Sequence, residues 1–193
     1  MTVQARLLNS TWATGSGSLE WQGRSEQVVF VRLFDEYFPR VYNYAHYRCG
    51  DAETADDLAA QTFERAFSRL EQYDPQRGPF GAWLFAIARN LVNDHLRRLQ
   101  QRACLPIEKF ENCPALTASP EESLIQVEAQ AELMAALAHL NERERDLLSL
   151  KFAAGLTNRR IAELTGLSEG NVGVIVYRAL GHLRVILATG DSL

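Results

Sequence analysis

The apolar residues of this chain recur at intervals of three and four, and no stretch of useful length alternates between apolar and polar residues. The first spacing marks one face of an α-helix, whereas alternation marks a half-buried strand. At 193 residues, the chain can form one domain or two small ones. We therefore predict an all-α fold of two small helical domains joined by a flexible linker.

Turn-forming residues and helix caps divide the chain into segments. Asp51 and the turn at 74–79 separate three main helices in the first half, and Pro79 stands where a new helix can begin. Capping boxes at 119–122 and 141–144 begin helices in the second half. The predicted organisation is a flexible leader over 1–24, a helical domain over 25–98, a linker over 99–118 and a second helical domain over 119–187.

The composition excludes several classes of protein. Hydrophobic residues make up 47% of the chain and charged residues 23%, as in soluble globular proteins. Neither a run of roughly 18 apolar residues nor a signal peptide is present, so we expect a cytoplasmic protein without membrane insertion. The three cysteines, Cys49, Cys104 and Cys113, show neither CxxC spacing nor a nearby histidine pair. A redox or metal role, through His46 with Cys49 or through Cys104 with Cys113, is the minor alternative. We assign no metal, no cofactor and no catalytic residue.

The segment from Thr157 to Arg184 has the pattern of a helix-turn-helix. Ala162 is a small residue where two helices cross, Gly166 can adopt a positive φ at the turn, and Ser168 can cap the second helix. A plain helical hairpin with a solvated outer face is the alternative. The face of the second helix that we expect to be buried carries Val172, Ile175, Val176, Ala179, Leu180 and Leu183, and the opposite face carries Gly170, Asn171, Val174, Tyr177, Arg178 and Gly181.

Two further segments, at 51–67 and 80–98, closely resemble the two signature helices of region 2 of bacterial sigma factors. The segment from Leu140 to Arg184 resembles region 4 of the same family. On these matches, the chain is similar to the extracytoplasmic-function sigma factors of the sigma-70 family. The resemblance implies a non-enzymatic subunit that binds core RNA polymerase and promoter DNA, with an anti-sigma factor as a further partner.

The resemblance also implies a role for individual residues. Acidic and polar residues on the helix at 52–71 would bind the clamp helices of the polymerase beta-prime subunit, although a merely solvated face is the alternative. We expect Phe80 in the core, and Trp83 either in the core or as a stacking surface for a base. Arg97 and Arg98 could bind duplex phosphates or merely complement the helix dipole. The implied sets are Asp56, Asp57, Gln61 and Glu64 for the polymerase; Arg77, Trp83, Arg89, Asn90, Arg97 and Arg98 for the minus 10 element; and Arg159, Arg160, Ser168, Glu169, Gly170, Asn171, Val174 and Arg178 for the minus 35 element.

The sequence departs from the family pattern in its charge. The formal net charge is −4, and Gly173, Val174, Gly181 and His182 stand where relatives often carry basic or polar residues. We therefore expect the free protein to bind duplex DNA poorly. A conventional helix-turn-helix transcriptional regulator is the main rival, and it predicts tight duplex binding without polymerase. An enzyme that uses Cys49 and the scattered histidines is a second rival.

Overall fold

The computed structural model describes residues 26–103 and 122–189. Within these ranges every regular element is a helix, which confirms the prediction of an all-α fold. In chain order the elements are α2 (Glu26–Cys49), α3 (Ala52–Ser68), the short 3₁₀ helix η1 (Leu70–Gln72), α4 (Phe80–Ala103), α5 (Glu122–Ala138), α6 (Glu142–Phe152), α7 (Asn158–Thr165) and α8 (Glu169–Thr189).

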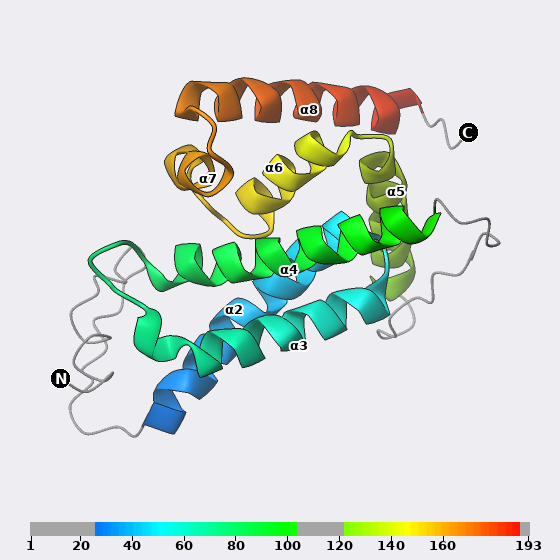
Figure 1. Cartoon of the computed structure of the whole chain (residues 1–193). Coiled ribbons are helices and arrows are strands. Elements are labelled where there is room, and N and C mark those ends of the chain that lie inside the picture. Colours follow the sequence, from blue (N-terminus) through cyan, green and yellow to red (C-terminus); the bar gives the residue numbers. More distant parts are fainter. Residues whose placement is uncertain (1–25, 104–121, 190–193) are drawn as a thin grey trace.

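The helices form two bundles that lie against each other (Figure 1). Helices α2, α3 and α4 pack together as the first bundle, and α5, α6, α7 and α8 form the second. Helices α6 and α7 lie between α4 and α8 (Figure 1). Contacts between α2 and α6 and between α4 and α7 join the bundles directly.

Aromatic side chains fill the core of the first bundle. The Phe34 ring stacks on Phe38 at a centroid distance of 4.7 Å and meets Phe63 at 4.9 Å. Tyr37 packs so closely on Gly81 that a Cβ atom at position 81 would lie 2.8 Å from the tyrosine ring. Only a residue without a side chain fits there, so this glycine sets how closely α2 and α4 approach.

The second bundle begins its central helix with the predicted capping box. The side-chain oxygen of Asn141 accepts a hydrogen bond from the Glu144 N–H at 2.9 Å, and the Glu144 carboxylate accepts one from the Asn141 N–H at 3.3 Å. Both bonds satisfy N–H groups that the start of α6 leaves without helical partners. The other predicted capping box, at 119–122, lies largely outside the described residues. The core of the second bundle contains five fully buried residues: Leu147, Leu150, Ile161, Val172 and Ala179.

Two features differ from the sequence-based expectation. The sequence predicts a linker that includes residues 99–103, but α4 continues through Ala103, because this stretch contains good helix formers and no proline or glycine. Residues Glu169–Ala188 are long and apolar enough to meet the length and composition criteria for a membrane span. In this structure α8 instead packs against α5, α6 and α7, so part of its apolar surface belongs to the core of the second bundle.

Candidate nucleic-acid interface and the contact between the two bundles

The turn between α7 and α8 has the backbone geometry of a helix-turn-helix. Gly166 ends α7 with a φ of 73°, in the left-handed region that favours glycine, and its N–H donates to the Ala162 carbonyl at 2.9 Å. Thr157 caps α7, and the Ser168 hydroxyl caps α8 by accepting the Asn171 N–H at 3.3 Å. The predicted glycine and the predicted Ser168 cap are therefore both present in the structure.

Helix α8 has one buried face and one exposed face. Val172, Val176, Ala179 and Leu183 are buried, as the spacing predicts, and Ile175 is half-buried. The expectation for Leu180 was wrong, because its side chain is 41% exposed. At 100° per residue, position 180 stands at the edge of the apolar stripe, where the neighbouring helices no longer cover it.

The outward face of α8 is open to a partner. Val174 is 48% exposed and Tyr177 is 79% exposed, so this face offers apolar and aromatic atoms as well as polar ones. Arg160 differs, because it is only partly exposed and pairs with Glu163 at 2.6 Å; this pairing, with help from Arg159, lowers the pKa of the Glu163 carboxyl. The other residues assigned to the minus 35 element are exposed: Arg159, Ser168, Glu169, Gly170, Asn171, Val174 and Arg178.

An ordered turn precedes α4 in the first bundle. The Tyr73 hydroxyl donates to the Gly78 carbonyl at 3.1 Å, and the Asp74 carboxylate accepts the Gln76 N–H at 3.0 Å. Phe80 is 3% exposed, which confirms that it belongs to the core. Trp83 is half-buried between core and surface, with its ring centroid 5.5 Å from the rings of both Tyr73 and Phe80.

The residues assigned to the minus 10 element fall into two groups. Arg77, Asn90, Arg97 and Arg98 are exposed, and Arg97 also pairs with Asp94 on its own helix. Arg89 is different: its side chain is 24% exposed and contacts the second bundle. The structure thus places four of the six residues on the surface with Trp83 half-buried, while Arg89 takes part in the contact between bundles.

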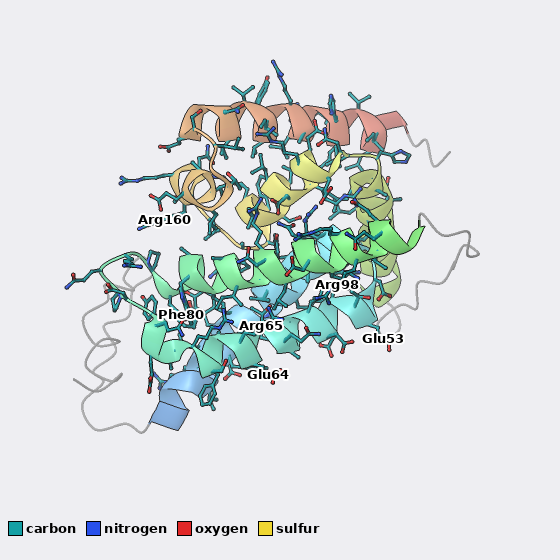
Figure 2. The ribbon with its side chains drawn as sticks, viewed as in Figure 1. Glu53, Glu64, Arg65, Phe80, Arg98 and Arg160 are labelled. Atoms are coloured by element: carbon teal, nitrogen blue, oxygen red, sulfur yellow. The ribbon has the colours of Figure 1, made fainter. Side chains whose placement is uncertain are left out.

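The acidic residues of α3 lie on its outer side. Glu53 and Glu64 project away from the bundle there (Figure 2). The four residues assigned to polymerase binding, Asp56, Asp57, Gln61 and Glu64, are all exposed, whereas Ala55, Leu58, Ala59, Thr62, Phe63 and Ala66 are buried on the opposite side. Asp51 caps the helix as predicted, and its hydrogen bonds with Thr54 lower the pKa of its carboxyl. One face of α3 is thus acidic and free of core contacts.

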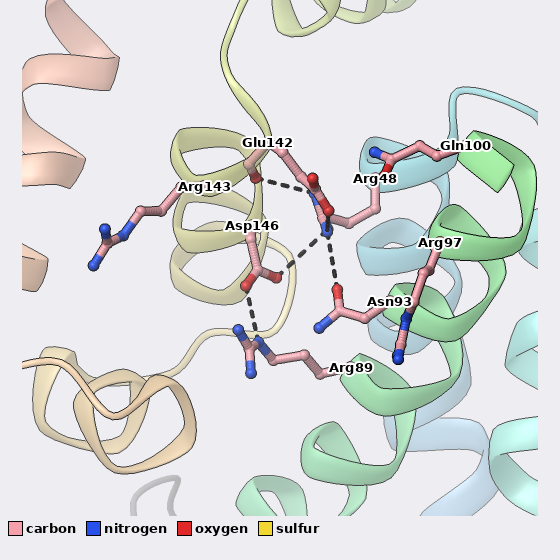
Figure 3. A pocket seen from close by; sticks show the side chains of 8 residues that line it. All are labelled: Arg48, Arg89, Asn93, Arg97, Gln100, Glu142, Arg143 and Asp146. Carbon is pink, nitrogen blue, oxygen red and sulfur yellow. Dashed lines mark hydrogen bonds and ion pairs between the residues drawn. The ribbon is translucent and has the colours of Figure 1, made fainter. Parts of the chain in front are cut away.

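A buried carboxylate joins the two bundles at a place that sequence reasoning missed. Asp146 of α6 accepts a hydrogen bond from the Tyr44 hydroxyl at 2.8 Å. It accepts another from Arg89 Nε at 2.8 Å (Figure 3). Arg48 Nε lies 3.5 Å from the same carboxylate. Burial, together with the charge of Asp146, raises the pKa of Tyr44 well above its usual value, so this hydroxyl keeps its proton at neutral pH.

Backbone carbonyls of the second bundle complete the contact. Arg48 Nη1 donates to the Glu142 carbonyl at 3.1 Å, Arg89 Nη1 donates to the Leu164 carbonyl at 3.2 Å, and Arg40 donates to the Ala154 carbonyl. The Leu164 carbonyl lies in the last turn of α7, where carbonyls lack helical partners and carry partial negative charge. An open hollow of about 470 Å³ adjoins this contact and is lined by Arg48, Arg89, Asn93, Arg97, Gln100, Glu142, Arg143 and Asp146 (Figure 3).

One sequence signal could have revealed this contact. Arg48 continues the i, i+3, i+4 series formed by Val41, Tyr44 and Ala45, which are all buried. An arginine in phase with a core face is rarely buried without a partner. The spacing could therefore have predicted a buried polar contact, but it could not have identified Asp146, which lies 98 residues further along the chain.

The environment of Cys49 argues against a reactive thiol. Burial raises the pKa of Cys49 to about 11, so little thiolate exists at neutral pH. Burial lowers the pKa of the neighbouring His46. His182 Nδ1 lies 3.4 Å from Glu144 Oε1. Both residues belong to the second bundle, whereas Cys49 belongs to the first. The rival hypothesis of an enzyme built on Cys49 gains no support from this geometry.

A three-helix bundle with an acidic outer face, joined to a helix-turn-helix bundle, defines a two-domain all-helical protein of the DNA-binding class. The family model for sigma-70 region 2 matches residues 33–102, and the model for sigma-70 region 4 matches residues 130–183. The chain therefore belongs to the extracytoplasmic-function sigma factors of the sigma-70 family. We call α2–α4 region 2 and α5–α8 region 4 from here on.

Individual relatives agree with this assignment. The chain is 36% identical over 162 residues to the sigma factor BldN of Streptomyces coelicolor, a match that covers 84% of this chain and 61% of BldN. It is 34% identical over 142 residues to ShbA of Streptomyces griseus, covering 71% of this chain and 74% of ShbA. Its fold is similar to that of Bartonella quintana RpoE, solved with the anti-sigma factor NepR, with 22% identity, a TM-score of 0.66, and coverage of 84% of this chain and 99% of RpoE.

Proposed function

We propose that this chain binds core RNA polymerase and directs it to a specific set of promoters. The observation that carries the proposal is the presence of region 2 and region 4 in one chain, in the order of the family. Bond formation would belong to the polymerase, so this chain itself would act without catalysis. Because its partners are the polymerase and chromosomal promoters, its place of action would be the cytoplasm.

Region 2 would supply the contact with polymerase and the reading of the minus 10 element. The exposed carboxylates of α3 suit a basic partner such as the beta-prime clamp helices. Arg77, Asn90, Arg97 and Arg98 offer cations for phosphates and an amide for a base edge. Capture of unstacked bases would drive promoter opening, at a cost of a few kcal/mol per base that pocket contacts recover.

Region 4 would read the minus 35 element through α8. The exposed side of the first turns of α8, including Asn171 and Val174, faces outward and can enter a major groove. The net charge of −4 offers little phosphate neutralisation, so tight promoter binding would require the holoenzyme. We also infer an anti-sigma factor as a partner, because a free sigma factor would otherwise compete continuously for polymerase.

The decisive experiment incubates the tagged protein with purified core RNA polymerase and then transcribes genomic fragments with the recovered complex. We expect stoichiometric capture of polymerase and transcripts that begin at a restricted set of sites. Promoter binding by the isolated protein is measured in parallel at physiological salt. Nanomolar, sequence-specific duplex binding without polymerase capture would overturn the proposal and favour a conventional helix-turn-helix regulator.

A further inference from the structure

One buried carboxylate lies at the centre of the contact between region 2 and region 4. The Asp146 side chain is 8% exposed, and the Arg48 side chain beside it is 1% exposed. All the side-chain partners of Asp146 described above, Tyr44, Arg48 and Arg89, belong to region 2. We name these three groups the Asp146 seat. This carboxylate therefore serves the contact between domains and not the core of its own domain.

The contact combines polar interactions with buried apolar side chains of both bundles. Its directed interactions are hydrogen bonds and ion pairs from Arg40, Tyr44, Arg48 and Arg89. Permanent interfaces are mostly apolar, whereas contacts between mobile domains are more polar. A buried ion pair also gains little over the solvated, separated charges, because removing both ions from water offsets their attraction. The polar part of this contact can therefore open at a modest cost in free energy.

The Asp146 seat also has the chemistry of a phosphate site. Two guanidinium groups and a hydroxyl surround the buried Asp146 carboxylate, and Arg48 Nη2 also lies 3.4 Å from the more exposed Glu142 carboxylate. Arginine binds carboxylate and phosphate oxygens with the same donors. Arg89 belongs to the set assigned to the minus 10 element. In the structure, its N–H groups bind Asp146 and the Leu164 carbonyl, so the same N–H groups cannot bind a DNA phosphate at the same time. Its location in region 2 makes the seat accessible to nucleic acid once region 4 moves away.

A second candidate DNA residue is held at the same domain contact. The Arg160 guanidinium of region 4 lies so close to the turn before α4 that a Cβ atom on Gly78 would be 3.2 Å from its Nη1. Arg77, adjacent in the chain, belongs to the minus 10 set. The closed arrangement thus brings Arg160 of the minus 35 set against the turn beside Arg77, so Arg160 is only partly available for DNA.

We propose that Asp146 is an internal phosphate mimic that latches the free protein in a closed, autoinhibited state. This inference rests on the proposed function. In the closed state, Asp146 occupies the seat on region 2; in the open state, the domains separate and nucleic-acid phosphate replaces the carboxylate. Because the apparent affinity of a protein scales with the fraction in the competent state, the latch weakens binding by the ratio of closed to open molecules.

The test uses the full chain and two variants that lie outside the candidate DNA and polymerase sets. Asp146→Asn removes the charge of the latch from region 4, and Tyr44→Phe removes one hydrogen-bond donor from region 2. Asp35→Asn is the matched control, since it makes the same chemical change at an exposed position of α2. Small-angle X-ray scattering reports domain separation, and circular dichroism checks that each variant keeps its helices.

We expect Asp146→Asn to raise the radius of gyration by several ångströms above the parent value, for which a compact chain of this length gives roughly 16 Å as a lower bound. The same variant should bind a fluorescent oligodeoxythymidine 20-mer on the order of tenfold more tightly than the parent. Tyr44→Phe should shift both quantities in the same direction by a smaller factor, because it weakens the closed contact but also removes the hydroxyl of the seat, while both guanidinium groups remain. Asp35→Asn should leave the radius unchanged.

The outcomes separate the latch from the proposed function. An unchanged radius for both latch variants overturns the closed state, and opening without tighter oligonucleotide binding overturns the phosphate-mimic role. If Asp146→Asn loses helical content, the Tyr44→Phe result decides. Neither readout requires polymerase, so the two proposals can fail separately. If Asp146→Asn opens the protein but the parent never captures core polymerase, the proposed function is refuted and the latch remains supported.

Discussion

Replacing Asn171 by alanine tests whether α8 reads bases directly. Asn171 is exposed in the first turn of α8, which is the part of a recognition helix that enters the major groove. Its backbone N–H is bound to the Ser168 hydroxyl, whereas no hydrogen bond in the described part of the chain engages its side-chain amide. That amide can make a bidentate contact with adenine.

The expected loss of promoter affinity differs in kind between Asn171→Ala and Arg178→Ala. Loss of one bidentate base contact corresponds to about 1 to 3 kcal/mol, so Asn171→Ala should lower promoter affinity about 5- to 150-fold at sites with the preferred base. Arg178 is exposed seven residues further along α8, about 10 Å along the helix axis. At that distance from the groove-entering turn, we expect Arg178→Ala to remove a phosphate contact and reduce the salt slope by about one.

The assay measures holoenzyme binding to a library of minus 35 variants at two salt concentrations, with the minus 10 element held constant. Arg184→Ala is the control, because Arg184 is exposed on α8 but lies on a different side of the helix from Arg178. If Asn171→Ala lowers every library member by one factor while Arg178→Ala changes the preferred sequence, the two roles are reversed. If neither substitution has an effect, α8 does not face DNA.

Three further predictions concern the docking face and the stability of the fold. Asp56→Lys combined with Asp57→Lys should weaken core polymerase binding at least about tenfold with helical content unchanged, and Asp35→Lys should not; equal binding would exclude the α3 face. Asn141→Ala should lower the free energy of unfolding by about 1 kcal/mol in urea titrations, and Asn141→Ser should restore most of it. Burial lowers the pKa of His46 below 6.5, so folding favours the neutral imidazole. The free energy of unfolding should therefore fall as the pH drops below 6.5, and His46→Asn should flatten that dependence. An unchanged slope in the variant would contradict this role of His46.

Local rules were enough to predict most of the secondary structure and the helix-turn-helix. The caps at Asp51, Asn141 and Ser168 and the left-handed turn at Gly166 depend on residues within four positions of one another, so the sequence contains all the information they need. The burial of Phe80 follows from the spacing of its own helix in the same way. Family membership was also readable, because the motifs of regions 2 and 4 are continuous segments.

Tertiary structure decided the contacts that depend on how two helices far apart in the chain meet. Helical periodicity places Arg89 on the surface of α4 near Asn90, but it contains no information about α6, which covers Arg89 with Asp146. The same holds for Leu180, whose exposure depends on where the neighbouring helices end. A helix specifies its own faces through its 3.6-residue period, whereas the partner of each face is set by the packing of the whole chain.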